Sequence, residues 1–86
     1  MRIEVDYIGM ANAAEVAVLG RAALERGEAE IDLARVQRCD SSAVAVLLEW
    51  QRAARERGIA LKVSGLPAGL VSLAAVYGVA ELLPAA

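Results

Sequence analysis

The stretch IDLARVQRCDSSAVAVLLEWQRAARERGIALKVSG, residues 31–65, carries a strand pattern, a helix pattern and a second strand pattern in succession. Apolar side chains recur at nearly alternate positions in residues 29–36 and 59–64, as in strands with one buried face. Between them, residues 41–57 place apolar side chains at helical spacing, and Gly58 supplies a helix stop. A strand–helix–strand unit of this length favours right-handed parallel pairing of its two strands. The stretch therefore predicts the centre of an α/β fold.

The sequence before this stretch predicts one more strand and one more helix. Residues 2–7 alternate charged and apolar side chains, which indicates a strand. Asn12 with Glu15 three residues later fits a capping box in which Asn replaces the usual Ser or Thr. We expect the helix to end at Gly27. Its buried stripe is expected to consist of Val16, Leu19, Ala23 and Leu24.

The sequence after it predicts a third helix. Pro67 suits a first helical position, and Gly78 is expected to end the helix. The residues expected to be buried on this helix are Leu70, Leu73, Ala74 and Tyr77. The order of elements is therefore β-α-β-α-β-α.

The expected sheet has one polar face. Charged residues occupy alternate strand positions at Glu4, Asp6, Asp32 and Lys62. Strands of a parallel sheet that is covered on both faces read as continuous apolar runs, which these do not. We expect a single α/β domain over residues 1–86, with a small mixed or parallel sheet and its helices packed on one face.

Composition excludes several classes of protein. Hydrophobic residues make up 58% of the chain and the net charge is −2, so surplus apolar surface on the helices is expected to be covered by a partner. No stretch approaches the roughly 18 uninterrupted apolar residues of a membrane span. The alternating N-terminus is not a signal peptide, which predicts a cytoplasmic protein without direct membrane insertion. Nine Lys and Arg against eleven Asp and Glu, with no basic run, argue against nucleic acid.

Neither a metal nor a cofactor is expected. Cys39 is the only cysteine, and the chain has no histidine, so it has neither an internal disulfide nor a Cys/His metal site. A nucleophilic serine in Asp40-Ser41-Ser42 lacks a histidine base, and the only lysine, Lys62, is expected on the outer face of a strand. We therefore expect no catalytic residues and exclude a serine hydrolase.

The segment Asp40-Ser41-Ser42 has two compatible interpretations. Asp and Ser are preferred helix caps, and a serine at a helix start is also exposed, where a phosphate would be held by the free N–H groups. One sheet face cannot bury every apolar residue of the helix that follows, of which Trp50 is expected in the core or at its edge. The remaining side of that helix forms a strip that is either solvated or a docking surface. It consists of Ser41, Ser42, Ala45, Glu49, Arg52 and Glu56.

The segment IDLARVQRCDSSAVAVLLEWQRAARERGIALKVSGLPAGLVSLAAVYGVAELLP resembles a STAS domain, the fold of bacterial anti-sigma factor antagonists. The resemblance covers about residues 9–84 and implies a small sheet with helices on one side. In the antagonists the serine directly after the aspartate is phosphorylated by a partner kinase, which implies Ser41 as a candidate phosphorylation site. The ending LVSLAAVYGVAELLP is similar to MlaB-like proteins, the STAS subunits of the ABC transporter that maintains outer-membrane lipid asymmetry.

The chain departs from that family pattern in three places. The first strand region is shortened, Ala43 and Ala45 stand where many members have Gly, and the last helix of the sigma-factor antagonists is missing. The third departure favours the MlaB-like alternative.

The resemblance implies a non-enzymatic cytoplasmic subunit, peripheral to the inner membrane through its partner, the ATPase subunit of an MlaFEDB-type ABC phospholipid transporter. The expected partner-binding residues are Asp40, Ser41, Ser42, Ala45, Glu49 and Arg52. The alternative is an anti-sigma factor antagonist that is switched by an anti-sigma factor serine kinase. Neighbouring genes would separate the two: ABC permease and ATPase genes, or genes for a kinase and a sigma factor.

Overall fold

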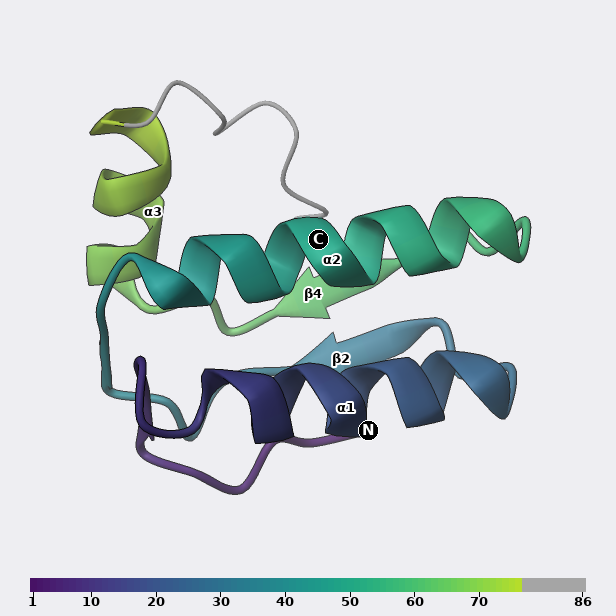
Figure 1. Ribbon diagram of the computed structural model, residues 1–86, viewed down its shortest axis with the longest axis horizontal. Coiled ribbons are helices and arrows are strands. Elements are labelled where there is room, and N and C mark those ends of the chain that lie inside the picture. The colour runs from purple at the N-terminus through teal and green to yellow at the C-terminus, as the bar shows by residue number, and fades with distance from the viewer. Residues whose placement is uncertain (77–86) are drawn as a thin grey trace.

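The computed structural model describes residues 1–76, and within them strands and helices alternate much as the sequence predicts (Figure 1). The elements are β1 (Tyr7–Ile8), α1 (Ala13–Glu25), β2 (Glu30–Asp32), β3 (Arg38–Cys39), α2 (Ser42–Glu56), β4 (Lys62–Ser64) and α3 (Ala68–Val76). The α/β class is confirmed. The strand β3 is an addition that the sequence pattern did not predict.

The predicted parallel pairing of the two central strands is confirmed. Strand β2 runs parallel to β4, with Ile31 opposite Val63, and both of these side chains are buried. Their neighbours in the strands, Glu30 and Lys62, are exposed on the other face. The alternation in sequence therefore corresponds to one apolar and one polar face of the sheet.

The predicted strand at 29–36 is shorter in the structure, where only Glu30–Asp32 form β2. The Asp32 carboxylate accepts a hydrogen bond from the Ala34 backbone N–H at 2.8 Å, and the Val36 N–H donates to the Leu33 carbonyl at 2.9 Å. This aspartate turn ends β2, and the chain resumes as β3, which pairs in parallel with β1. A local side-chain hydrogen bond thus interrupts the strand where hydrophobic spacing alone predicts continuity.

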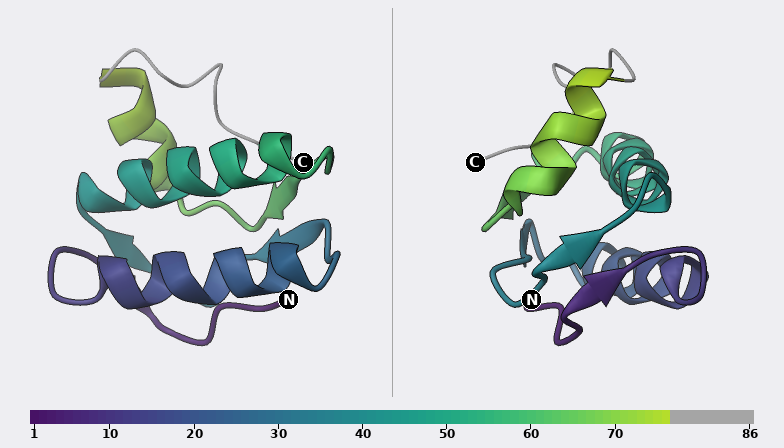
Figure 2. Two further views of the ribbon diagram at one scale, coloured as in Figure 1. Left: turned by 45° about the vertical axis from the view of Figure 1, so that its right-hand side comes forward. Right: turned by 90° about the vertical axis from the view of Figure 1, so that its left-hand side faces the viewer.

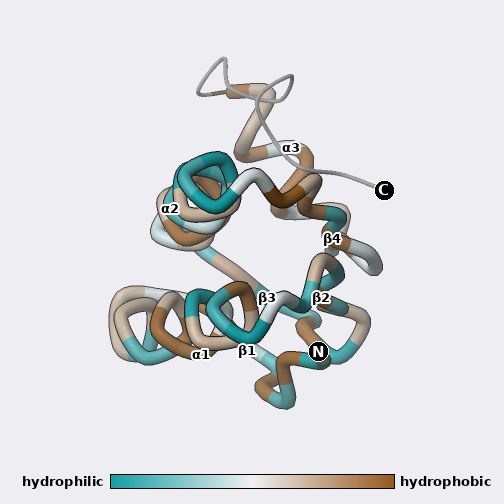
Figure 3. Tube along the Cα trace, turned by 90° about the vertical axis from the view of Figure 1, so that its right-hand side faces the viewer, coloured by the Kyte–Doolittle hydropathy of each residue, from teal (hydrophilic) through white to brown (hydrophobic). Residues whose placement is uncertain are grey.

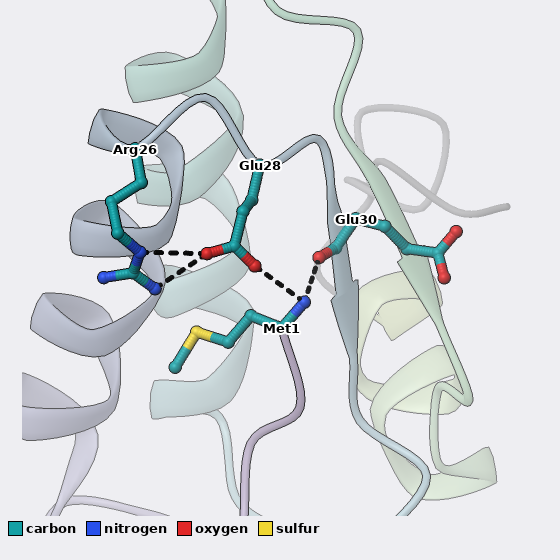
Figure 4. A network of polar contacts seen from close by, with 4 residues as sticks. All are labelled: Met1, Arg26, Glu28 and Glu30. Atoms are coloured by element: carbon teal, nitrogen blue, oxygen red, sulfur yellow. Dashed lines mark hydrogen bonds and ion pairs between the residues drawn. The ribbon is translucent and has the colours of Figure 1, made fainter.

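The predicted strand at 2–7 is also broken, and its two parts pair with different strands. The Ile3 N–H donates to the Asp32 carbonyl at 3.0 Å, so the first residues pair with β2, whereas β1 pairs with β3 farther on. The Met1 amino group reinforces this edge (Figure 4): it donates to the Glu30 carbonyl at 2.9 Å and lies 3.2 Å from the Glu28 carboxylate. Hydrogen bonds from Arg26, and then from this amino group, lower the pKa of Glu28.

The helices α1 and α2 lie side by side and run in the same direction over one face of β2 and β4 (Figures 1 and 3). The left-handed glycines Gly27 and Gly58, with φ of +84° and +68°, end them as predicted. Helix α3 packs against α2 and β3, at the end of the domain where α2 begins (Figure 2). The strands form two two-stranded sheets, β1 with β3 and β2 with β4, where the sequence predicts one sheet, and the starts of all three helices lie near the same end of the domain.

Two expectations for α1 are wrong. Leu19 is 44% exposed, and the residue buried in its neighbourhood is Gly20. The buried face is centred on Gly20 because a large side chain of α2 lies against it. The capping box is also absent, since the Asn12 side chain bonds to Gly9 and Tyr7 in the preceding loop and caps no N–H of the helix.

The large side chain that lies against Gly20 is Trp50. Its expected place in the core is confirmed. Trp50 is 0% exposed, and its indole N–H donates to the Ala17 carbonyl at 3.1 Å. A Cβ on Gly20 would lie 2.2 Å from the indole ring. The close packing of α1 on α2 therefore depends on the absence of a side chain at this glycine.

Helix α3 buries a narrower stripe than predicted. Leu70 and Ala74, one turn apart, are buried, whereas Leu73 is only half-buried. The expected burial of Leu73 is thus only partly met, because α3 contacts the rest of the domain along one stripe. Tyr77 and Gly78 lie outside the described residues.

The difference in burial between two leucines gives a stability prediction. Leu47 is 1% exposed in the core, so Leu47→Ala is expected to lower the free energy of unfolding by about 2–5 kcal/mol. Leu73→Ala is expected to lower it by clearly less, since part of that side chain is already in water. Urea denaturation of both variants measures the difference. An equal loss for the two would show that Leu73 packs as tightly as Leu47.

Candidate partner-binding site

The Asp40 carboxylate organises the start of α2. Its Oδ1 accepts a hydrogen bond from the Ser42 backbone N–H at 2.8 Å and another from the Ser42 hydroxyl. Ser41 has helical backbone angles, φ −62° and ψ −21°, and its side chain makes no capping hydrogen bond. The cap predicted for this segment is therefore supplied by Asp40, and the Ser41 hydroxyl is not used for it.

The second oxygen of the same carboxylate connects α2 to a distant part of the chain. Asp40 Oδ2 accepts hydrogen bonds from the Tyr7 hydroxyl and from the Met10 backbone N–H, both at 3.3 Å. These hydrogen bonds, with the one from the Ser42 hydroxyl the strongest, lower the pKa of Asp40. The pKa of Tyr7 is raised, first by desolvation and then by the charge of Asp40. One ionised carboxylate thus holds the β1–α1 loop beside the start of α2.

The two serines differ in accessibility. Ser41 is exposed, whereas Ser42 is half-buried and hydrogen-bonded to Asp40. A modifying enzyme or a docking partner could therefore reach the hydroxyl of Ser41 more readily than that of Ser42. Lys62, the only lysine of the chain, lies in β4 on the outer face of the sheet and not beside Ser41. No base that would activate Ser41 as a nucleophile is positioned beside it among the described residues.

The rest of the predicted strip follows the outer side of α2. Ala45, Arg52 and Glu56 are exposed. Glu49 is half-buried because its carboxylate pairs with the guanidinium of Arg21 on α1. The strip is therefore uncharged at Ser41, Ser42 and Ala45 and becomes charged at Glu49, about two turns after Ser41.

Sequence reasoning missed the contribution of the β1–α1 loop. Met10, in this loop, is 87% exposed and joined to Asp40 through its backbone. The available signal was an apolar residue inside the turn-like segment Gly9-Met10-Ala11-Asn12. Met10 and Asp40 are 30 residues apart in sequence, so a pattern of neighbouring residues could not predict their contact.

Three further findings concern metal binding, the cysteine thiol and membrane-spanning helices. Residues 1–76 contain no cluster of Cys, Asp and Glu suited to hold a metal ion. Cys39 is half-buried beside Asp40, and burial raises the pKa of its thiol, which makes the thiolate scarce. Within the same residues, no helix has the length and apolar character needed to cross a bilayer.

Comparison with known proteins identifies the family. A family model described as "Mlab, STAS domain" matches residues 7–84, which is most of the chain. No curated protein and no solved structure matches. The matched residues include β3, the Asp40-Ser41-Ser42 segment and α2, which build the site described above. The chain therefore belongs to the MlaB-type STAS domain family.

Proposed function

We propose that the protein is a non-enzymatic subunit that binds the ATPase of an MlaFEDB-type ABC phospholipid transporter through the start of α2. In this role it is cytoplasmic and reaches the inner membrane only through its partner. The observation that carries the proposal is the start of α2, where Ser41 and Ala45 are exposed and uncharged and Asp40 bonds to both Ser42 and Met10. The membership in the MlaB-type family directs the proposal to a transporter ATPase.

The physical character of this surface suits docking of a folded protein. Small side chains at Ser41 and Ala45 let the backbone of a partner approach α2 closely. Because Asp40 already fixes the start of the helix, binding would lose little conformational entropy there. Arg52 and Glu56 are exposed farther along α2 and would supply polar groups at the rim of such an interface.

A second candidate function is that of an anti-sigma factor antagonist. The accessible Ser41 hydroxyl directly after Asp40 favours it, since a serine kinase could add a phosphate there. Both functions use the same surface. They are separated by which purified protein binds it, the transporter ATPase subunit or the anti-sigma factor serine kinase.

A negative charge at Ser41 is expected to weaken partner binding. Ser41→Glu should reduce the affinity for the ATPase subunit by about tenfold or more, because the partner would have to desolvate a carboxylate beside Asp40. Ser41→Ala should bind much better than Ser41→Glu. Neither change is expected to alter stability much, since acidic groups are favourable at a helix start. Calorimetric titration of the purified ATPase subunit measures all three affinities.

The matched control is Ser72→Glu, which makes the same substitution at an exposed position of α3. It should bind the ATPase subunit as the wild type does. If Ser41→Glu binds as tightly as Ser72→Glu, Ser41 lies outside the interface and the proposed docking surface is wrong. If the wild type binds the kinase and not the ATPase subunit, the second candidate function replaces the first.

A further inference from the structure

Four hydrogen bonds close the β1–α1 loop, which presents one large apolar side chain to solvent. The Gly9 N–H donates to the Asn12 side chain at 2.9 Å, and the Asn12 amide donates to the Tyr7 carbonyl at 2.7 Å. The N–H groups of Asn12 and Ala13 both donate to the Gly9 carbonyl, at 3.0 and 2.8 Å. Met10 lies inside this network with 87% of its surface exposed, the highest value among the large apolar residues of the described chain. The methionine is thus presented without a packing partner from its own fold.

The loop is fastened directly beside the candidate partner-binding site. Asp40 accepts the hydrogen bond from the Met10 N–H with one oxygen and caps the start of α2 at Ser42 with the other. The approach leaves no space at Gly9, where a Cβ would lie 1.7 Å from the Tyr7 hydroxyl oxygen and 2.8 Å from Asp40. A partner that covers Ser41 therefore meets the methionine loop as well.

Around the Asp40 carboxylate, which is the charged group between the loop and α2, several exposed residues carry no charge. The ion pair between Arg21 and Glu49 fixes the alignment of the two parallel helices. Counting back two turns, about seven residues, from this ion pair along each helix brings Ala14 of α1 level with Ser42 of α2. Ala14 and Val18 of α1 are exposed. We call the exposed, uncharged residues Met10, Ala14, Val18, Ser41 and Ala45 the uncharged area.

We propose that Met10 is an apolar anchor of the docking surface and that it inserts into an apolar pocket of the same ATPase subunit. Asp40 is the positioning residue that holds this anchor beside Ser41. The inference rests on the proposed function and deepens it by adding the β1–α1 loop to the interface. A flexible methionine fills an irregular apolar pocket well, and its burial would add apolar contact that the small residues of α2 do not supply.

The charge pattern favours a protein over a lipid surface as the occupant. Amphipathic segments that bind membranes flank their apolar face with Lys and Arg. Here the apolar area is bordered by a neutralised pair, Arg21 with Glu49, and by the carboxylate of Asp40. The whole chain has a net charge of −2.

The test compares two polar substitutions at exposed apolar positions. Met10→Gln keeps the length of the side chain and is expected to weaken binding of the purified ATPase subunit by about tenfold. Leu19→Gln is the control, since Leu19 is also exposed but points to the side of α1 away from α2. It should bind as the wild type does. Urea midpoints of both variants should stay close to the wild-type midpoint.

A separate measurement tests the role of Asp40. In Asp40→Asn, which loses a carboxylate oxygen and its charge, we expect faster hydrogen exchange at the Met10 amide and weaker binding. Tyr7→Phe removes only the hydroxyl bond to Asp40 and should show the same two effects at smaller size. Unchanged exchange at Met10 in Asp40→Asn would contradict the positioning role.

The outcomes separate the inference from the function on which it rests. If Met10→Gln binds like the wild type while Ser41→Glu binds weakly, the methionine anchor is wrong and the proposed function stands. If the wild type does not bind the ATPase subunit, both are wrong. Self-association of the wild type in sedimentation that Met10→Gln abolishes would assign the anchor to a second copy of the chain. Binding of anionic phospholipid vesicles that Met10→Gln abolishes would assign it to a membrane.

Discussion

Ala45→Arg is expected to reduce binding of the ATPase subunit by roughly hundredfold or more, the size of effect seen at interface hot spots. Ala45 is exposed on α2 one turn after Ser41 and belongs to the uncharged area. An arginine there would place a long charged side chain where the partner approaches the helix closely, and the charge would lose its water without gaining a partner. Calorimetric titration of the purified ATPase subunit measures the loss.

The stability of the same variant makes the result interpretable. Arginine is a good helix former and Ala45 faces solvent, so the free energy of unfolding measured with urea should stay within about a few tenths of a kcal/mol of the wild type. Ala60→Arg, at an exposed position after the far end of α2, is the matched control and should bind normally. Wild-type affinity in Ala45→Arg would place the interface elsewhere.

Trp50→Ala is expected to lower the free energy of unfolding by about 3–5 kcal/mol. The indole is fully buried between α2 and α1, and its N–H is satisfied by the Ala17 carbonyl. Removing it would leave a cavity in the contact between the two helices and would remove the indole hydrogen bond to Ala17. Because domains of this size have a total stability of about 5–15 kcal/mol, the loss is a large fraction of it. Denaturation with urea, followed by circular dichroism, measures the change.

The glycine facing the indole provides a coupled test. Gly20→Ala should destabilise the wild type by about 1–3 kcal/mol, since the new methyl would overlap the ring. In a Trp50→Leu background the same substitution should be much less harmful, because the smaller side chain leaves space. Equal effects of Gly20→Ala in the two backgrounds would contradict the contact between Gly20 and Trp50.

The parts of the fold that follow from local rules were predictable from the sequence. The parallel pairing of β2 with β4 follows from two alternating segments separated by a helix, and the helix stops follow from Gly27 and Gly58. The burial of Trp50 follows from its place on the apolar side of α2. Each of these features depends on neighbours in sequence or on a regular period.

The features that the sequence did not reveal depend on tertiary contacts. Leu19 is exposed and Gly20 buried because Trp50, 30 residues away, lies against the glycine. The strand predicted at 29–36 ends at Asp32 because the Asp32 side chain bonds to a backbone N–H two residues later, which competes with strand pairing. A hydrophobic pattern contains neither kind of information.

The candidate site likewise has features that the sequence predicts and contacts that it does not. Asp40-Ser41-Ser42 is recognisable as a helix start, and the exposure of Ser41 and Ala45 agrees with the predicted strip. The pairing of Glu49 with Arg21 and the bonds from Tyr7 and Met10 to Asp40 bring together residues about 30 positions apart. The docking role of these residues stays a prediction.

Mapping the contact surface in solution tests the central proposal most directly. The 15N-labelled protein, titrated with the unlabelled ATPase subunit, would report through each backbone amide signal whether that residue meets the partner. We predict that the amide signals of Met10, Ser41 and Ala45 shift or broaden first, while those of Glu30 and Lys62 on the outer face of the sheet change least. Unchanged signals at Ser41 and Ala45, with the changes concentrated on that outer face, would contradict the account.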